Sequence, residues 1–131
     1  MSATYASFDV LVLPSRTTAT WAEQFGRVLV EALSHGVAVV GSSSGEIPWV
    51  VESTGGGIVF PEGDVEALRS ALVTLRDDPQ RRARLASAGR AAVLERFSVP
   101  AVARALDAAL RGALSHVGSA SLAASWRPLP R

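Results

Sequence analysis

The segment FDVLVLPS, residues 8–15, decides the fold class. It is a continuous apolar run that contains valines and closes at Pro14, which is typical of a strand buried on both faces of a parallel sheet. The segment VAVVG, residues 37–41, has the same character. GIVF, residues 57–60, is a third short strand, and Pro61 ends it.

Helical patterns lie between and after these strands. Apolar residues recur at helical spacing from Phe25 to Ser34, and His35-Gly36 is a typical helix stop. The predicted helices cover residues 25–34, 47–53, 64–76, 78–97 and 98–115. The alternation predicts an α/β fold with three parallel strands and C-terminal helices over residues 1–115, and a flexible tail over residues 116–131.

Composition excludes several classes of protein. Hydrophobic residues make up 48% of the 131 residues and charged residues 19%, which suits a packed domain and argues against disorder. A formal net charge of +1 gives no basic surface for nucleic acid. The absence of cysteine excludes disulfides and thiol catalysis, and no apolar stretch is long enough to span a membrane. All 13 basic residues are arginine, which we interpret as the bias of a GC-rich, bacterial genome, and we expect a cytoplasmic protein.

The loop after the first strand leads into a helix that offers an anion site. The first N–H groups of the helix, those of Gly26, Arg27 and Val28, lack intrahelical acceptors, and the helix dipole is positive there. A glycine at this point lets a ligand approach the backbone closely. The alternative is that Gly26 only eases packing.

Two carboxylates, Glu23 and Glu31, lie eight residues apart around the start of this helix. An ionised Glu31 among apolar neighbours needs a partner, and the vicinal hydroxyls of a ribose would provide one. The alternatives are a solvated helix edge or an ion pair with Arg27, four residues earlier. The polar loop of residues 42–48 could touch the same ligand or be an ordinary turn before a helix.

The motifs occur in a specific order: E-x-F-G-x-x-x-x-E-A from Glu23, SGEIP from Ser44, and P-x-G-D from Pro61. Together with FDVLVLPS and VAVVG, this order resembles the C-terminal, nucleotide-sugar-binding domain of retaining glycosyltransferases of the GT-B fold, in glycosyltransferase family 4 or group 1. The resemblance covers about residues 6–110. It implies the second half of a Rossmann-like, doubly wound parallel-sheet domain.

The resemblance also implies a role for each carboxylate. Glu23 would be the catalytic residue and would hydrogen-bond the hydroxyls of the donor sugar, while Glu31 would bind the ribose of the nucleotide. The reaction would transfer a sugar from a nucleoside diphosphate sugar with retention, without a cofactor or an obligatory metal ion. The protein's task would be to stabilise the departing diphosphate and to position the acceptor.

Backbone amides would make further donor contacts in such an enzyme. Those of Phe25 and Gly26 would face the sugar, and those of Arg27 and Val28 the diphosphate. Further loop contacts are expected from Ser15, Ser44 and Gly45. Two positions depart from the family pattern: Ala38 replaces a frequent proline, and Trp49 stands where an acid is common.

Such enzymes also have an N-terminal domain that binds the acceptor, and residues 1–6 would be the last turn of a helix before the fourth of six strands. We therefore expect a chain that is inactive alone and needs that domain or a partner chain. Without the missing helices, Val10 and Val12 or Leu11 and Leu13 would face water. The chain could then self-associate through the strand between Phe8 and Pro14. The intact enzyme would be cytoplasmic or peripheral to a membrane. The alternatives are a non-catalytic nucleotide-sugar-binding or self-associating half-domain, and a fragment of a nucleotide-sugar epimerase.

Overall fold

The computed structural model describes residues 2–119. Residues up to Phe97 form one compact unit, and the chain from Ser98 onward belongs to a second. No helix in the described part of the chain is long and apolar enough to cross a bilayer. The elements are α1 (Ser2–Tyr5), β1 (Val10–Leu13), α2 (Arg27–Ser34), β2 (Ala38–Ser42), α3 (Ile47–Thr54), β3 (Gly57–Phe60), α4 (Val65–Asp77), α5 (Pro79–Arg96) and α6 (Val99–Ser119).

The three strands form one parallel sheet in the order β1-β2-β3. Val12 pairs with Val40, and Val40 with Ile58, so the register is continuous across the sheet. Every residue of the central strand β2 is buried, because β2 has a strand on each side and helices on each face. The predicted α/β fold with three parallel strands is confirmed.

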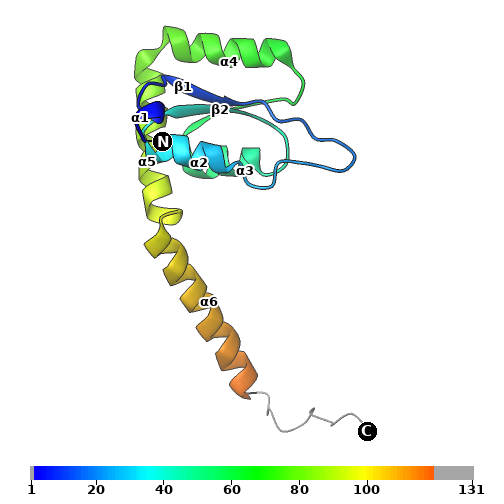
Figure 1. The fold of residues 1–131 in the computed structure, drawn as a ribbon, viewed down its shortest axis with the longest axis vertical. Coiled ribbons are helices and arrows are strands. Elements are labelled where there is room, and N and C mark those ends of the chain that lie inside the picture. Colours follow the sequence, from blue (N-terminus) through cyan, green and yellow to red (C-terminus); the bar gives the residue numbers. More distant parts are fainter. Residues whose placement is uncertain (1, 120–131) are drawn as a thin grey trace. The chain divides into compact units, whose positions relative to one another are not determined.

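Two apolar clusters cover the two faces of the sheet, with α2 and α3 on one face and α4 on the other (Figure 1). Alternate residues of β2 point to opposite faces, so Val39 joins the first cluster and Val40 the second. Leu29 and Leu33 bring α2 to the first face, and Leu75 brings α4 to the second. The sheet is therefore sandwiched between helices, as a buried parallel sheet requires.

Strand β1 differs from the prediction in length and burial. Only Val10–Leu13 pair as a strand, and all four residues are half-buried. Leu11 and Leu13 pack against the first cluster, and Val10 and Val12 against the second, so the expectation that one of these pairs faces water was wrong. The helices on both faces of the sheet cover these four side chains. Their burial is incomplete because, within the described residues, β1 has a neighbouring strand on one side alone.

The helix boundaries differ from the prediction by more than one residue at two places. Helix α2 begins at Arg27, and not at Phe25, because Gly26 adopts the left-handed conformation with φ 68°. Helix α6 continues to Ser119, so residues 116–119 are helical and not part of a tail; the rest of the predicted tail lies outside the described residues. One face of α6 carries exposed apolar side chains, from Val99 to Leu114.

Candidate functional site

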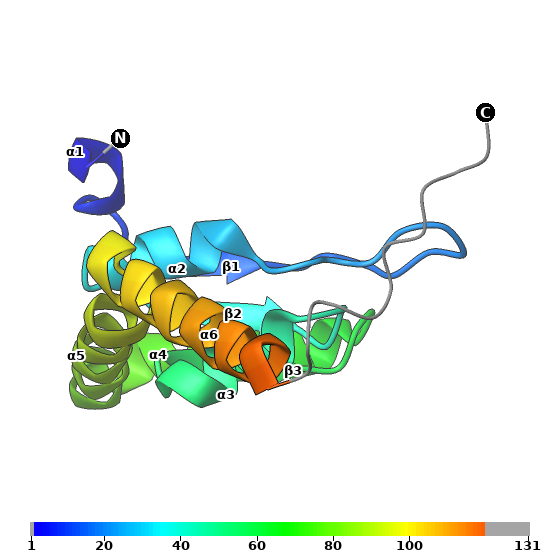
Figure 2. The same ribbon diagram turned by 90° about the horizontal axis from the view of Figure 1, so that it is seen from below.

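The loops that follow the three strands lie together at the carboxyl ends of the sheet, where ligands bind in open α/β folds. The loop between β1 and α2 projects beyond the strand ends, as both ribbon views show (Figure 2). The loop between β2 and α3 and the turn between β3 and α4 lie beside it, joined to it by the hydrogen bonds described next.

Gly45 brings the second loop against the backbone of Glu23. The amide of Glu46 donates to the Glu23 carbonyl oxygen at 2.9 Å. A Cβ at Gly45 would overlap that oxygen and would lie 2.8 Å from the carbonyl carbon, and φ at Gly45 is +53°. Only glycine fits this contact, which fixes where Glu23 stands.

A second set of hydrogen bonds ties the three loops together. The amide of Thr17 donates to Oε1 of Glu62 at 2.6 Å, and the amide of Glu62 donates to Oγ of Ser43 at 2.9 Å. The hydroxyl groups of Thr17 and Ser44 are 2.9 Å apart. Glu62 follows β3, so one side chain bridges the first loop and the third.

The Glu23 carboxylate lies at the mouth of α2 and already has two donors. Its Oε1 accepts the amide of Gly26 at 3.1 Å, and its Oε2 accepts the hydroxyl of Ser15 at 3.3 Å. The Ser15 carbonyl in turn accepts the hydroxyl of buried Ser42 at 2.6 Å. The predicted free amide at Gly26 was therefore wrong, because the Glu23 side chain occupies it. The next two amides of α2 are those of Arg27 and Val28. Gly26, at the N-cap position, has no side chain that could accept a hydrogen bond from them.

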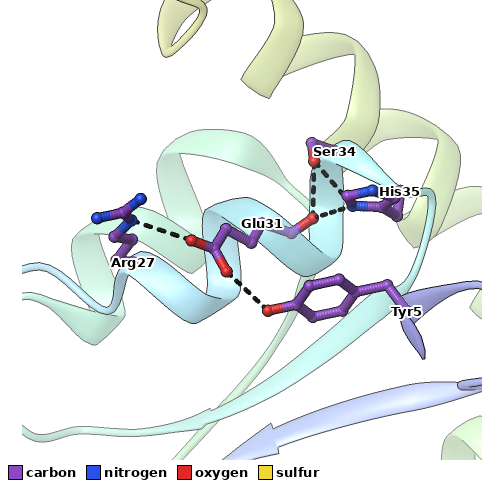
Figure 3. Close-up of polar contacts among 5 residues, drawn as sticks. All are labelled: Tyr5, Arg27, Glu31, Ser34 and His35. Carbon is purple, nitrogen blue, oxygen red and sulfur yellow. Dashed lines mark hydrogen bonds and ion pairs between the residues drawn. The ribbon is translucent and has the colours of Figure 1, made fainter. Parts of the chain in front are cut away.

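Glu31 lies on the second turn of α2, and both of its oxygens have partners (Figure 3). Oε2 accepts the hydroxyl of Tyr5 at 2.8 Å, and Oε1 accepts Nε of Arg27 at 3.0 Å. The side chain is 30% exposed, so it is still open to a ligand. The ion pair with Arg27, one of the alternatives from the sequence, is present.

Tyr5 is a member of this group that the sequence analysis missed. The hydrogen bond to Glu31 is the main cause that raises the pKa of Tyr5 above its ordinary value, and burial and the negative charge of Glu31 act in the same direction. The Tyr5 ring stacks on that of His35 at a centroid distance of 5.0 Å. The Nδ1 atom of His35 lies 2.8 Å from the Glu31 carbonyl oxygen (Figure 3).

The side chain of Phe25 packs in an aromatic cluster on α3 and α5. Its ring lies 5.8 Å from that of Phe97, and Trp49 meets Phe97 edge to face at 5.9 Å. The guanidinium of Arg96 lies over the Trp49 ring at 5.8 Å. The ring of Phe25 therefore packs against this cluster, although 39% of the residue remains exposed.

The structure thus brings most predicted site residues together in two neighbouring groups on α2 and its loops. The first contains Ser15, Glu23, Gly26 and Gly45, and the second contains Arg27 and Glu31. Within the described residues no group of three or more histidine, aspartate or glutamate side chains could hold a metal ion.

The fold is that of GT-B glycosyltransferases. Residues 1–92 match the model of the family described as glycosyl transferases group 1, and the chain belongs to this family.

Curated relatives are much longer than this chain. It is 38% identical over 97 residues to a GDP-mannose-dependent monoacylated alpha-(1-6)-phosphatidylinositol monomannoside mannosyltransferase of Corynebacterium glutamicum, a match that covers 72% of this chain and 25% of that protein. It is 39% identical over 93 residues to the sulfoquinovosyl transferase SQD2 of Arabidopsis thaliana, covering 69% of this chain and 17% of that protein. The chain therefore spans a quarter or less of the length of these relatives.

Two solved structures illustrate the similarity in fold. A sucrose-phosphate synthase from Thermosynechococcus elongatus superimposes with a TM-score of 0.72 and 28% identity, over 86% of this chain and 27% of that one. HepE of Anabaena, solved in complex with UDP-glucose, gives a TM-score of 0.69 and 29% identity, over 83% of this chain and 29% of that one.

Proposed function

We propose that this chain forms the donor-binding part of a retaining glycosyltransferase that transfers a sugar from a nucleoside diphosphate sugar to an acceptor. The observation that carries the proposal is the placement of Glu23 at the mouth of α2, where Ser15, the Gly26 amide and the loop after β2 hold it, in a chain of the group 1 family. The mannosyltransferase relative named above uses GDP-mannose, and HepE was solved with UDP-glucose, which supports a nucleoside diphosphate sugar as the donor class.

The diphosphate binds at the amides of Arg27 and Val28, where the dipole of α2 favours an anion. The vicinal hydroxyls of the ribose donate to the Glu31 carboxylate. No metal ion is required in this arrangement, because the helix terminus stabilises the charge that develops on the departing diphosphate.

The sugar lies against Glu23 and the amide of Phe25, within reach of loop residues Ser15, Ser44 and Gly45. Gly26 and Ser15 hold the Glu23 carboxylate before any sugar arrives, so its position needs little reorganisation. A sugar hydroxyl donates to one of the carboxylate oxygens, which have lone pairs to spare. Glu23 acts in this way as the residue that orients the donor for transfer.

Acceptor binding is assigned to residues outside these 131, because the chain spans only a quarter of the mannosyltransferase relative. We therefore expect no transfer activity from the chain by itself. Activity should return when the rest of the enzyme, within one chain or as a partner chain, is present.

The test is a comparison of two ligands in the protein at its full natural length. Glu23→Ala should weaken the binding of GDP-mannose or UDP-glucose, whichever the protein binds, by about ten- to a hundredfold, the loss expected for hydrogen bonds to a charged group. The binding of GDP or UDP should stay nearly unchanged. The matched control is Glu66→Ala, which removes an exposed carboxylate from α4 on the opposite face of the sheet. Equal losses for the sugar nucleotide and the bare nucleotide would contradict the role of Glu23.

A second candidate, self-association, is favoured by the edge of β1. Among the described residues no strand pairs with its outer side, and Val10–Leu13 contains neither a charge nor a proline to block pairing. Two copies joined along β1 would extend the sheet and bury half-exposed valine and leucine side chains. Light scattering coupled to size-exclusion chromatography tests this candidate. A dimer that a Val12→Arg substitution disrupts supports it, and a stable monomer of the unaltered chain at micromolar concentration contradicts it.

A further inference from the structure

We propose that Tyr5 is a positioning residue of the nucleotide site: its hydroxyl fixes the Glu31 carboxylate in the orientation that accepts both hydroxyls of a ribose. The inference rests on the proposed function, which assigns the ribose to Glu31. It adds a residue that precedes the first strand, 26 positions away in the sequence, to the donor site.

The hydroxyl of Tyr5 is a fixed donor. The side chain is only 8% exposed. Its ring stacks on His35 with an interplanar angle of 20°, and the ring of Phe8 meets it edge to face at 5.9 Å. Because two aromatic neighbours restrain the ring, its hydroxyl is held in one place, 2.8 Å from Oε2 of Glu31.

The other partner of Glu31 is of a different kind. The side chain of Arg27 is 86% exposed, and it pairs with Oε1 across one turn of the helix. Exposed pairs of this type contribute little to stability and exchange readily with water or a ligand. Figure 3 shows the two partners on opposite sides of the Glu31 carboxylate. Arg27 can therefore leave when a nucleotide arrives, whereas Tyr5 stays.

The carboxylate retains the capacity to bind a diol while Tyr5 is bound. Its two oxygens have about four lone-pair sites in total, and Tyr5 occupies one of them. A glutamate on a helix surface otherwise samples several rotamers, and restraining it costs conformational entropy. Tyr5 meets that cost before the nucleotide binds, so the free carboxylate already faces the ribose. If Tyr5 instead competed with the ribose, its removal would strengthen nucleotide binding.

The experiment measures the affinity of the protein at its full natural length for UDP and GDP and for their 2′,3′-dideoxy analogues, which lack the diol. Tyr5→Phe keeps the ring and removes only the hydroxyl. Of UDP and GDP, the nucleotide that binds more tightly should lose about two- to tenfold in affinity, the effect of one hydrogen bond. The affinity for its dideoxy analogue should not change. Ser7→Ala is the matched control: it removes a hydroxyl from the same segment, one that bonds to the Thr4 carbonyl and not to Glu31, and should change neither affinity.

The double variant separates this inference from the proposed function. In a Glu31→Ala background, Tyr5→Phe should have no further effect, because the group that it positions is gone. Unchanged UDP and GDP affinity in Glu31→Ala would overturn the ribose assignment, and the inference with it. Suppose that Glu31→Ala weakens nucleotide binding. The role of Tyr5 alone is then overturned if Tyr5→Phe leaves nucleotide affinity unchanged or increases it, or if Tyr5→Phe weakens binding of the dideoxy analogue as much as binding of the nucleotide.

Discussion

Replacing Gly45 by alanine tests whether the second loop places Glu23. At Gly45 the backbone has φ +53°, and a Cβ there would overlap the Glu23 carbonyl oxygen and approach its amide nitrogen to 2.9 Å. These are backbone atoms, which cannot rotate away as the end of a side chain can. The two loops must therefore separate, and the hydrogen bond from the Glu46 amide to the Glu23 carbonyl is lost.

The magnitude follows from comparison with Gly55, which has nearly the same backbone conformation. Its φ is +61°, and a Cβ there would meet nothing within 4 Å. Gly55→Ala should therefore cost only the strain of a left-handed residue, about 1–2 kcal/mol of unfolding free energy. Gly45→Ala should cost about 2–5 kcal/mol, because overpacking against backbone and one lost hydrogen bond add to the same strain.

Denaturant unfolding of both variants gives the stability difference, and titration with the nucleotide sugar that the protein binds gives the functional one. Gly45→Ala should be the less stable variant and should lose affinity for the nucleotide sugar, while Gly55→Ala should keep that affinity under conditions where both are folded. Equal destabilisation of the two variants would show that the overlap with Glu23 is relieved at no cost. Unchanged affinity in Gly45→Ala would show that the position of Glu23 does not matter for the donor.

Three further predictions concern the loops, the packing and the buried tyrosine. Glu62→Ala should accelerate hydrogen exchange of the Thr17 amide, which donates to Glu62, and Glu62→Gln should restore protection because it keeps an acceptor oxygen; unchanged exchange in the alanine variant would contradict the bridge. Gly89→Ala should lower the thermal stability of the protein, because the new Cβ would lie 2.8 Å from the Cα of Gly56 in the turn before β3. This loss should exceed the gain of about 1 kcal/mol that alanine has over glycine within a helix. A gain in stability would refute this close packing. Tyr5 is the sole tyrosine of the 131 residues, so tyrosinate absorption follows its titration, and Glu31→Ala should lower the raised pKa toward the ordinary value. In the unaltered protein the raised pKa means that Tyr5 loses its hydroxyl proton at lower pH in the unfolded chain than in the folded one. The free energy of unfolding should therefore fall as pH rises above about 10, and Tyr5→Phe should not show this fall. Identical dependence of stability on pH in the two proteins would contradict the hydrogen bond.

The sequence was sufficient to locate the three strands and most helix limits to within one residue, because those depend on local patterns, although β1 is shorter and less buried than predicted. The run VAVVG has no polar position, and β2 is buried throughout. Asp64 and Asp78 both cap helices, accepting the amides of Ala67 and Arg81 as capping residues do. Such features are set by neighbours within one turn of chain.

The site was predictable only in part, because several of its contacts join distant segments. Glu23 and Glu31 stood out as charges around an apolar helix, but the alternative partner Arg27 could not be weighed against a ribose from spacing alone. The bond from Tyr5 depends on how the segment before β1 folds back on α2, and the contact of Gly45 with Glu23 depends on the packing of two loops. No local pattern in the sequence encodes either contact.

A crystal structure of the full-length protein with bound UDP or GDP would test the donor site most directly. The account predicts that the diphosphate accepts hydrogen bonds from the amides of Arg27 and Val28. It also predicts that both ribose hydroxyls donate to the Glu31 carboxylate, with Tyr5 still bonded to Oε2 and Arg27 displaced from Oε1. A nucleotide bound away from the mouth of α2, or one whose ribose does not touch Glu31, would contradict it.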